Sequence, residues 1–163
     1  MRTKQVNRYY CDFCKKSGCS KFHLQKHESS CTANPNRVCR MCKFVADDGG
    51  ECEQKPMAEL LALLPKGPCQ KCGGKHFELH VNSPFGADEI SSCLSCNELT
   101  GRAVLAMPSL RKAAVDCPMC ILAAIRQAGL ASYIDNETFD FKKERERLFS
   151  DINDARATAD HYG

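Results

Sequence analysis

The pattern of apolar and polar positions predicts a short helix and a half-buried strand in the first half of the chain. Four leucines crowd into residues 60–64, between Pro56 and Pro65. Proline is tolerated at the first turn of a helix and ends one that it follows, so a short and largely buried helix is expected between them. Residues 75–81 alternate apolar and polar side chains, which is typical of a strand that buries one face.

Two helices are expected around residue 118. Residues 102–116 predict a short helix that begins at about Pro108. A second helix should follow Cys117, because Pro118 suits a first helical turn and an alanine-rich run precedes Gly129, a favoured helix-terminating residue.

A charged C-terminal helix is predicted from Phe139 to about Ala157, after a helix-start signal at residues 135–138. The expected ion pairs at i, i+4 are Lys142 with Glu146 and Arg147 with Asp151. An apolar stripe runs through Phe141, Leu148, Phe149, Ile152 and Ala155. Two interpretations remain open: the stripe packs on the rest of the chain, or the 138–157 helix binds a protein partner or a second copy.

Cysteine changes this picture, because the 163 residues include thirteen cysteines and no tryptophan. Ten of them form five Cys-x-x-Cys pairs: Cys11/Cys14, Cys39/Cys42, Cys69/Cys72, Cys93/Cys96 and Cys117/Cys120. This spacing is typical of zinc sites rather than disulfides. The basic start of the chain does not resemble a signal peptide, and no apolar run reaches the length of a membrane span. An intracellular, reducing compartment (cytoplasm or nucleus) is expected, with zinc replacing part of the hydrophobic core.

The first ligand set is Cys11, Cys14, His27 and Cys31, with spacings of two, twelve and three residues. Residues 9–32 thereby resemble the Cys2His2 zinc-finger family in its Cys2HisCys variant, and Tyr9 and Leu24 stand where that family buries an aromatic residue and a leucine. Gly18 replaces the family's core aromatic residue, a space that Phe13 or Phe22 could fill. His23, one turn before His27, is an alternative to Cys31 as the fourth ligand. Cys19 and Cys52 are left as free thiols.

The resemblance implies that the finger's helix reads bases through Ser20, His23 and Lys26. The charge distribution agrees, because residues 1–45 carry ten Lys/Arg against two Asp/Glu, whereas the other residues carry thirteen against eighteen. Phosphate contacts are expected from the surrounding basic residues, Arg2, Lys4, Arg8, Lys15, Lys16 and Lys21. DNA is favoured over RNA. A single finger covers only about 3 bp, however, so binding of a protein is the alternative.

The four later Cys-x-x-Cys pairs can share two zinc ions in sequential, cross-brace or nested order. We expect the nested order, which joins Cys69 and Cys72 to Cys93 and Cys96, and encloses that set within Cys39, Cys42, Cys117 and Cys120. The inner segment is self-contained, with a knuckle, a strand, a turn and a second knuckle, and residues 37–44 indicate a further knuckle. Three zinc ions are therefore predicted for the whole chain.

Residues 69–101 also resemble the zinc-bound frame of HNH (treble-clef) nucleases, through Cys69-x-x-Cys72-Gly, Leu79-x-Val81, a turn rich in Pro and Gly, and Cys93-x-x-Cys96-Asn with Gly101. The family places a catalytic histidine just after the first hairpin strand. Asn82 and Ser83 stand at that place here, and His80 lies two residues too early. The resemblance therefore implies a scaffold without catalysis.

These patterns predict a small α+β zinc-stabilised protein in three parts. A ββα-type finger occupies residues 1–36, a nested two-zinc module of treble-clef or zinc-ribbon type residues 37–130, and a charged helix residues 131–163. The expected function is regulatory or architectural nucleic-acid binding. The alternatives are a non-catalytic adaptor subunit of a larger assembly and, third, a divergent HNH-type nuclease.

Overall fold

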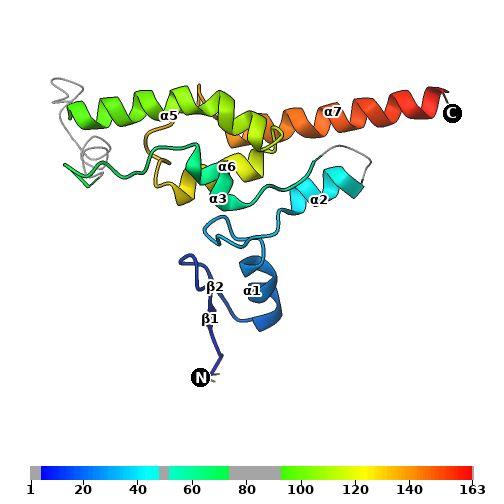
Figure 1. The fold of residues 1–163 in the computed structure, drawn as a ribbon. Coiled ribbons are helices and arrows are strands. Elements are labelled where there is room, and N and C mark those ends of the chain that lie inside the picture. The colour runs from blue at the N-terminus through cyan, green and yellow to red at the C-terminus, as the bar shows by residue number, and fades with distance from the viewer. Residues whose placement is uncertain (1–4, 48–51, 74–92, 163) are drawn as a thin grey trace, which may run out of the picture.

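The chain folds into a small hairpin-and-helix unit beneath a larger helical body (Figure 1). The computed structural model describes residues 5–47, 52–73 and 93–162. The elements run β1 (Tyr9–Tyr10), β2 (Ser17–Gly18), α1 (Lys21–Glu28), α2 (Arg40–Asp47), α3 (Met57–Ala62), α5 (Leu94–Ala113), α6 (Pro118–Gln127) and α7 (Phe141–Tyr162). None of the helices in these ranges is long and apolar enough to span a bilayer.

The N-terminal unit, which we call the finger, is a two-stranded antiparallel hairpin followed by α1. Tyr9 pairs with Gly18 and Tyr10 with Ser17. Its small core joins Leu24 to the ligand cysteines, with Tyr9 packed against them. Phe13 and Phe22 do not fill this core, because they are 41% and 68% exposed.

The segment between the finger and the helical body is fixed by hydrogen bonds. Residues 34–37 are rich in turn-forming residues, yet Asn34 and Arg37 are buried. The Asn34 side chain donates to the Glu28 carbonyl at 2.8 Å. From α6, Gln127 Nε2 donates to the carbonyls of Thr32 at 2.8 Å and Asn34 at 3.1 Å. These contacts attach the finger to the C-terminal end of α6 and leave no hinge there.

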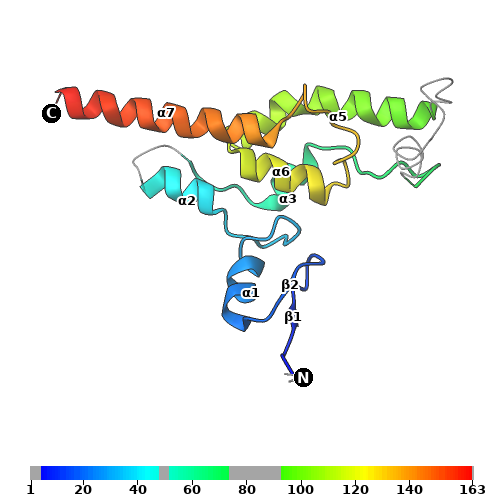
Figure 2. The ribbon, with the colours of Figure 1, turned by 180° about the vertical axis from the view of Figure 1, so that it is seen from behind.

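The core of the helical body lies where α3, α5 and α6 meet. Leu60, Leu110, Ile121 and Leu130 are completely buried there. The short helix expected between Pro56 and Pro65 is α3, which contacts α6. Burial of four such side chains contributes on the order of 6–12 kcal/mol of transfer free energy. Figure 2 shows from behind that α6 lies between α5 and the finger.

The elements predicted at residues 37–44 and from about Pro108 differ from the structure. Residues 40–47 form the α2 helix, not only a knuckle around Cys39 and Cys42. The helix expected from about Pro108 begins 14 residues earlier, because α5 spans Leu94–Ala113 with Pro108 inside it. Helix interiors usually exclude proline, which removes one backbone hydrogen bond. Here Leu99, Ala103, Met107 and Leu110 form a continuous buried stripe that holds both halves of α5 against the body.

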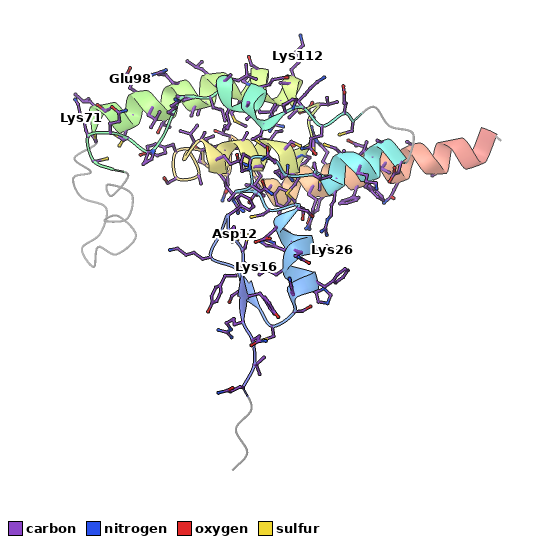
Figure 3. All side chains as sticks on the ribbon, turned by 60° about the horizontal axis from the view of Figure 1, so that its bottom comes forward. Asp12, Lys16, Lys26, Lys71, Glu98 and Lys112 are labelled. Atoms are coloured by element: carbon purple, nitrogen blue, oxygen red, sulfur yellow. The ribbon has the colours of Figure 1, made fainter. Side chains whose placement is uncertain are left out.

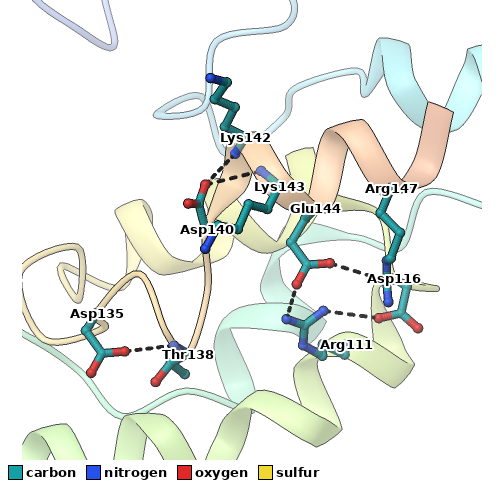
Figure 4. Close-up of polar contacts among 9 residues, drawn as sticks. All are labelled: Arg111, Asp116, Asp135, Thr138, Asp140, Lys142, Lys143, Glu144 and Arg147. Atoms are coloured by element: carbon teal, nitrogen blue, oxygen red, sulfur yellow. Dashed lines mark hydrogen bonds and ion pairs between the residues drawn. The ribbon is translucent and has the colours of Figure 1, made fainter. Parts of the chain in front are cut away.

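Helix α7 starts two residues later than predicted and extends further. Asp140 caps it, since Oδ1 accepts from the backbone N–H groups of Lys142 at 2.9 Å and Lys143 at 3.2 Å. The predicted start signal instead forms a separate turn, in which Asp135 Oδ1 accepts from Thr138 N at 2.7 Å. Figure 4 shows the Asp140 cap and the Asp135 turn. Beyond its first turns α7 projects past the body in both views (Figures 1 and 2).

Neither predicted i, i+4 ion pair is formed in the described part of α7. Glu144 binds Arg111 of α5 instead, and Arg147 pairs with Glu144 at 3.1 Å. The tertiary contact with α5 therefore replaces the local pairs expected from the spacing.

The fold class agrees with the prediction in part. The protein is small and mixed, but it is mostly helical, and the sheet in the described ranges is the hairpin β1–β2. The strand expected at residues 75–81 lies outside the described residues. So do His80, Asn82 and Ser83, on which the nuclease interpretation depended. The expected second knuckle at Cys93 is instead the start of a long helix, with Cys93 at its N-cap.

Candidate metal centres

The first cluster joins the hairpin to α1. Cys11, Cys14, His27 and Cys31 offer one sulfur or nitrogen atom each, and all four atoms lie within 4.8 Å of one another. Cys14 Sγ lies 3.2 Å from His27 Nε2. His23 is not in the cluster, because its exposed ring packs edge-on against Phe22. The structure thus selects Cys31 as the fourth member, as the spacing favoured.

The second cluster is the most deeply buried. Cys39 and Cys42 lie at the start of α2, and Cys117 and Cys120 at the start of α6, with exposed fractions of at most 3%. Cys39 Sγ lies 3.7 Å from Cys117 Sγ, and Cys42 Sγ lies 3.5 Å from Cys120 Sγ. The N-terminus of α6 favours thiolates there, because its backbone N–H groups and dipole stabilise negative charge.

A buried arginine accompanies the second cluster. Arg37 is 3% exposed, and its Nη1 donates to Cys120 Sγ at 3.7 Å. Gln54 holds the same segment, since its Nε2 donates to the Arg37 carbonyl at 2.6 Å and its Oε1 accepts from Cys39 N. A zinc ion with four thiolates carries a net charge of about −2, so the guanidinium offsets a charge that burial would otherwise make costly.

The third cluster brings Cys69 and Cys72 to the start of α5. Cys69 Sγ lies 3.9 Å from Cys93 Sγ, and Cys72 Sγ lies 3.3 Å from Cys96 Sγ. The buried Tyr133 hydroxyl accepts from the Cys69 backbone N–H at 2.8 Å. Just before Cys69, Gly67 N donates to Ala128 O at 2.8 Å, and a Cβ on Gly67 would lie 2.5 Å from Gly129 O. Glycine at both positions therefore lets this cluster sit against the end of α6.

The donor sets fit zinc and exclude disulfides. All thirteen cysteines lie in the described part of the chain, and none is in a disulfide. An S–S bond needs about 2.05 Å, well below the 3.3–3.9 Å sulfur separations in the second and third clusters. Tetrahedral zinc with Zn–S bonds of about 2.3 Å would space its sulfur ligands by about 3.8 Å. Each of the three clusters could hold one metal ion, and the later pairs meet in the nested order.

The protonation of the ligands also suits a metal. Burial lowers the pKa of His27, which favours the neutral imidazole that binds zinc. Hydrogen bonding to Cys117 lowers the pKa of Cys39. The backbone N–H of Cys72 lowers the pKa of Cys69 to about 7, whereas burial raises the pKa of Cys96 to about 12. The second and third clusters thus each hold at least one thiol that ionises readily, although a metal is needed to ionise all four.

Those residues expected to contact nucleic acid that the structure describes lie on the finger. Lys21, His23 and Lys26 are exposed on α1, and Arg8, Lys15 and Lys16 are exposed on the hairpin and its flanks. Figure 3 shows Lys16 and Lys26 on the finger. Ser20 is the N-cap of α1, where its Oγ accepts from His23 N at 3.4 Å. Arg2 and Lys4 lie outside the described residues.

Sequence reasoning missed the residues that support the clusters. Arg37 lies 83 positions from Cys120 in the sequence, and Tyr133 lies 64 positions from Cys69. Gln54 lies 15 positions from Cys39. No spacing rule connects such pairs. Cys52, expected as a spare thiol, is buried beside the second cluster, where burial raises its pKa. Cys19 is exposed, as a free thiol would be.

Comparison of this chain with protein-family models, with curated proteins and with solved structures finds no match. The zinc-binding character of the chain therefore rests on the three clusters themselves.

Proposed function

We propose that this protein is a zinc-stabilised, regulatory or architectural nucleic-acid-binding protein whose contact surface is the exposed face of the finger. Three zinc ions hold it, one in a Cys2HisCys finger and two in a nested treble-clef-like module. We expect duplex DNA to bind better than RNA. A reducing intracellular compartment suits the thiolate ligands, and the role proposed is binding rather than catalysis.

The observation that supports this proposal is the charge of the exposed side of α1. Lys21, His23 and Lys26 are exposed there, next to Lys15 and Lys16 of the hairpin loop. The acidic residue of α1, Glu28, is turned toward the hairpin, where its Oε1 accepts from Asp12 N at 2.9 Å. A basic helix face with its carboxylate engaged elsewhere suits a phosphate backbone.

The experiment is a salt titration of nucleic-acid affinity for the zinc-loaded full chain. Replacing both Lys21 and Lys26 with alanine should weaken binding of a labelled duplex and make the slope of log K against log salt shallower by about 1.8, since each lost phosphate contact contributes about 0.9. The same series with single-stranded RNA distinguishes the two nucleic acids.

The matched control replaces two exposed lysines of the helical body, Lys66 and Lys112, with alanine. Lys112 lies on α5, on the far side of the body from the finger (Figure 3). This variant has the same net charge as the finger variant, and its binding should be almost unchanged. Equal losses in both variants would assign the binding to net charge and would contradict a finger surface.

A second candidate function is that of an adaptor subunit, and α7 is the observation that favours it. The helix leaves the body, and its side chains Leu148 and Ile152 stay partly exposed while Phe149 is 38% exposed. An amphipathic helix of this kind commonly packs on another protein. Stable co-purification of a stoichiometric protein that a Leu148→Ser, Ile152→Ser variant loses would favour the adaptor.

A further inference from the structure

A pocket opens where the finger, α2, α6 and α7 meet. Its volume is about 380 Å³, near the lower end for ligand sites, and suits one or two large side chains. Its apolar walls are Met41 and Phe44 of α2, Met119 of α6 and Phe149 of α7. The two phenylalanine rings lie 5.8 Å apart and are tilted by 58°. Both remain exposed, Phe44 by 40% and Phe149 by 38%. Such a wall is an anchor site for an apolar group, and methionine side chains adapt to its shape.

The polar edge of the pocket is positively charged. Arg37 and Arg40 line it with Ser30, and the lining that the structure describes contains no acidic residue. Arg40 is exposed. Its Nη2 donates to the Lys26 carbonyl, which holds the side chain at the edge and leaves its other donors available. Arg37 is 3% exposed and donates to Cys120 Sγ of the second cluster, so Arg40 carries the charge that a ligand in the pocket would meet. A guanidinium at the edge of an apolar pocket favours a carboxylate next to the apolar anchor.

Helix α7 adds to this charge. Arg145 stands one turn before Phe149, on the same side of the helix, and is exposed. On α2, Lys43 is exposed next to Phe44. By the same helical spacing, the nearby carboxylates are Asp47 of α2 and Glu146 of α7, so the basic Arg40, Lys43 and Arg145 outnumber them around the opening.

We propose that this pocket binds a peptide segment of a partner protein that carries one large apolar side chain flanked by carboxylates. The apolar side chain enters between Phe149 and Met119, and a carboxylate pairs with Arg40. A nucleobase fits less well. The tilted phenylalanine rings offer no parallel pair of faces for stacking, and the Ser30 hydroxyl already donates to the Lys26 carbonyl at 3.3 Å. This binding does not depend on nucleic-acid binding by the finger.

The experiment uses the zinc-loaded full chain with ¹³C-labelled methionine methyl groups. The probe is a short peptide with one phenylalanine between pairs of glutamates; its matched controls carry alanine for the phenylalanine, or lysines for the glutamates. We expect saturable shifts of the Met41 and Met119 signals with the first peptide only. The methyl groups of Met57 and Met107 are buried in the core, 5% and 3% exposed, and should not move.

A variant identifies the pocket without touching a metal ligand. Phe149→Ala should lower the affinity for the glutamate peptide by about tenfold, as expected for loss of one aromatic contact at the centre of a small interface. Phe22→Ala removes an exposed phenylalanine of the finger, 68% exposed, and should leave the affinity unchanged. Arg40→Glu should reverse the preference between the glutamate and lysine peptides, and native mass spectrometry verifies that zinc is retained.

Several results would overturn the proposal. They are the absence of saturable shifts at Met41 and Met119, equal affinity for the lysine peptide, or no effect of Phe149→Ala. Shifts of these two signals by single-stranded oligothymidine but not by the glutamate peptide would assign the pocket to nucleic acid and would equally reject a peptide partner.

Discussion

Arg37 supplies a buried positive charge beside the second cluster. The side chain is 3% exposed, and its guanidinium donates to Cys120 Sγ. Without it, four thiolates and one zinc would bury a charge of about −2 with less compensation.

We therefore predict that Arg37→Met weakens zinc binding at the second cluster by about 10–100-fold, the usual cost of losing a residue that supports a metal ligand. Chelator competition followed by native mass spectrometry should show this variant losing one zinc ion before the wild type does. Arg37→Lys, which keeps the charge, should recover part of the affinity. Arg8→Met, on the exposed edge of the finger, is the control; equal zinc loss in both would contradict a specific role for Arg37.

At this scale the sequence predicted the clusters well and their surroundings poorly. The twelve side chains in the three clusters are those that Cys-x-x-Cys and His-x3-Cys spacing selected, because two ligands in one tight turn form a local pattern. Arg37, Gln54 and Tyr133 act on cysteines that are brought near only by folding. Residues adjacent in the sequence give no signal of such long-range contacts.

Among the elements, α7 depends on one ion-pair network. Glu144 of α7 binds Arg111 of α5, which also reaches Asp116 Oδ1 at 3.5 Å (Figure 4). The Arg111 guanidinium also lies 5.9 Å from the centre of the Phe139 ring. Together with Phe141, which packs against the core, this contact fixes the start of the helix on the body.

We predict that Glu144→Gln lowers the local unfolding free energy of α7 by about 1 kcal/mol at neutral pH, the scale of a partly buried ion pair, since the Arg111 and Glu144 side chains are 25% and 17% exposed. Hydrogen exchange of the backbone amides in α7 should become faster, while that of α6 stays the same. Glu146→Gln removes an exposed carboxylate of the same helix and should have little effect. Arg111 lowers the pKa of Glu144, so the stabilisation is complete above the usual glutamate pKa and is lost as pH falls through the lowered value. Equal exchange in both variants would contradict this anchor.

Predictions of elements failed where distant contacts replaced local signals. Pro108 was interpreted as a helix start, because proline is common there, but the buried stripe of α5 stabilises the helix on both sides of it. Residues 34–37 have the composition of a hinge, yet Gln127 fixes them from α6. The alanine-rich α6 was predicted correctly, because its proline start and its apolar residues agree with its buried position.

At the scale of the whole molecule, the three clusters connect described segments that lie far apart in the sequence. The second cluster connects α2 to α6, the third connects the segment after α3 to α5, and the first closes the finger. Each structural zinc ion contributes an apparent free energy of about 10 kcal/mol or more in small domains, similar to the total stability of an ordinary domain.

Removing the metal should therefore unfold the chain. Native mass spectrometry of protein purified under reducing conditions should show three zinc ions per chain. A strong chelator at neutral pH should abolish most of the helical circular dichroism signal, and added zinc should restore it. Retention of the full helical signal after complete zinc removal would show that the apolar core suffices alone.

The nested order of the second and third clusters also sets a sequence of events during synthesis. As the chain leaves the ribosome, the finger can take up its ion once residue 31 has emerged, and the inner cluster once residue 96 has emerged. Cys39 and Cys42 must wait for Cys117 and Cys120, so they spend longest as unprotected thiols, with Cys52 close to them in sequence. The last site to close is thus the most deeply buried one, and a nascent chain that stops before residue 117 would leave it open to oxidation.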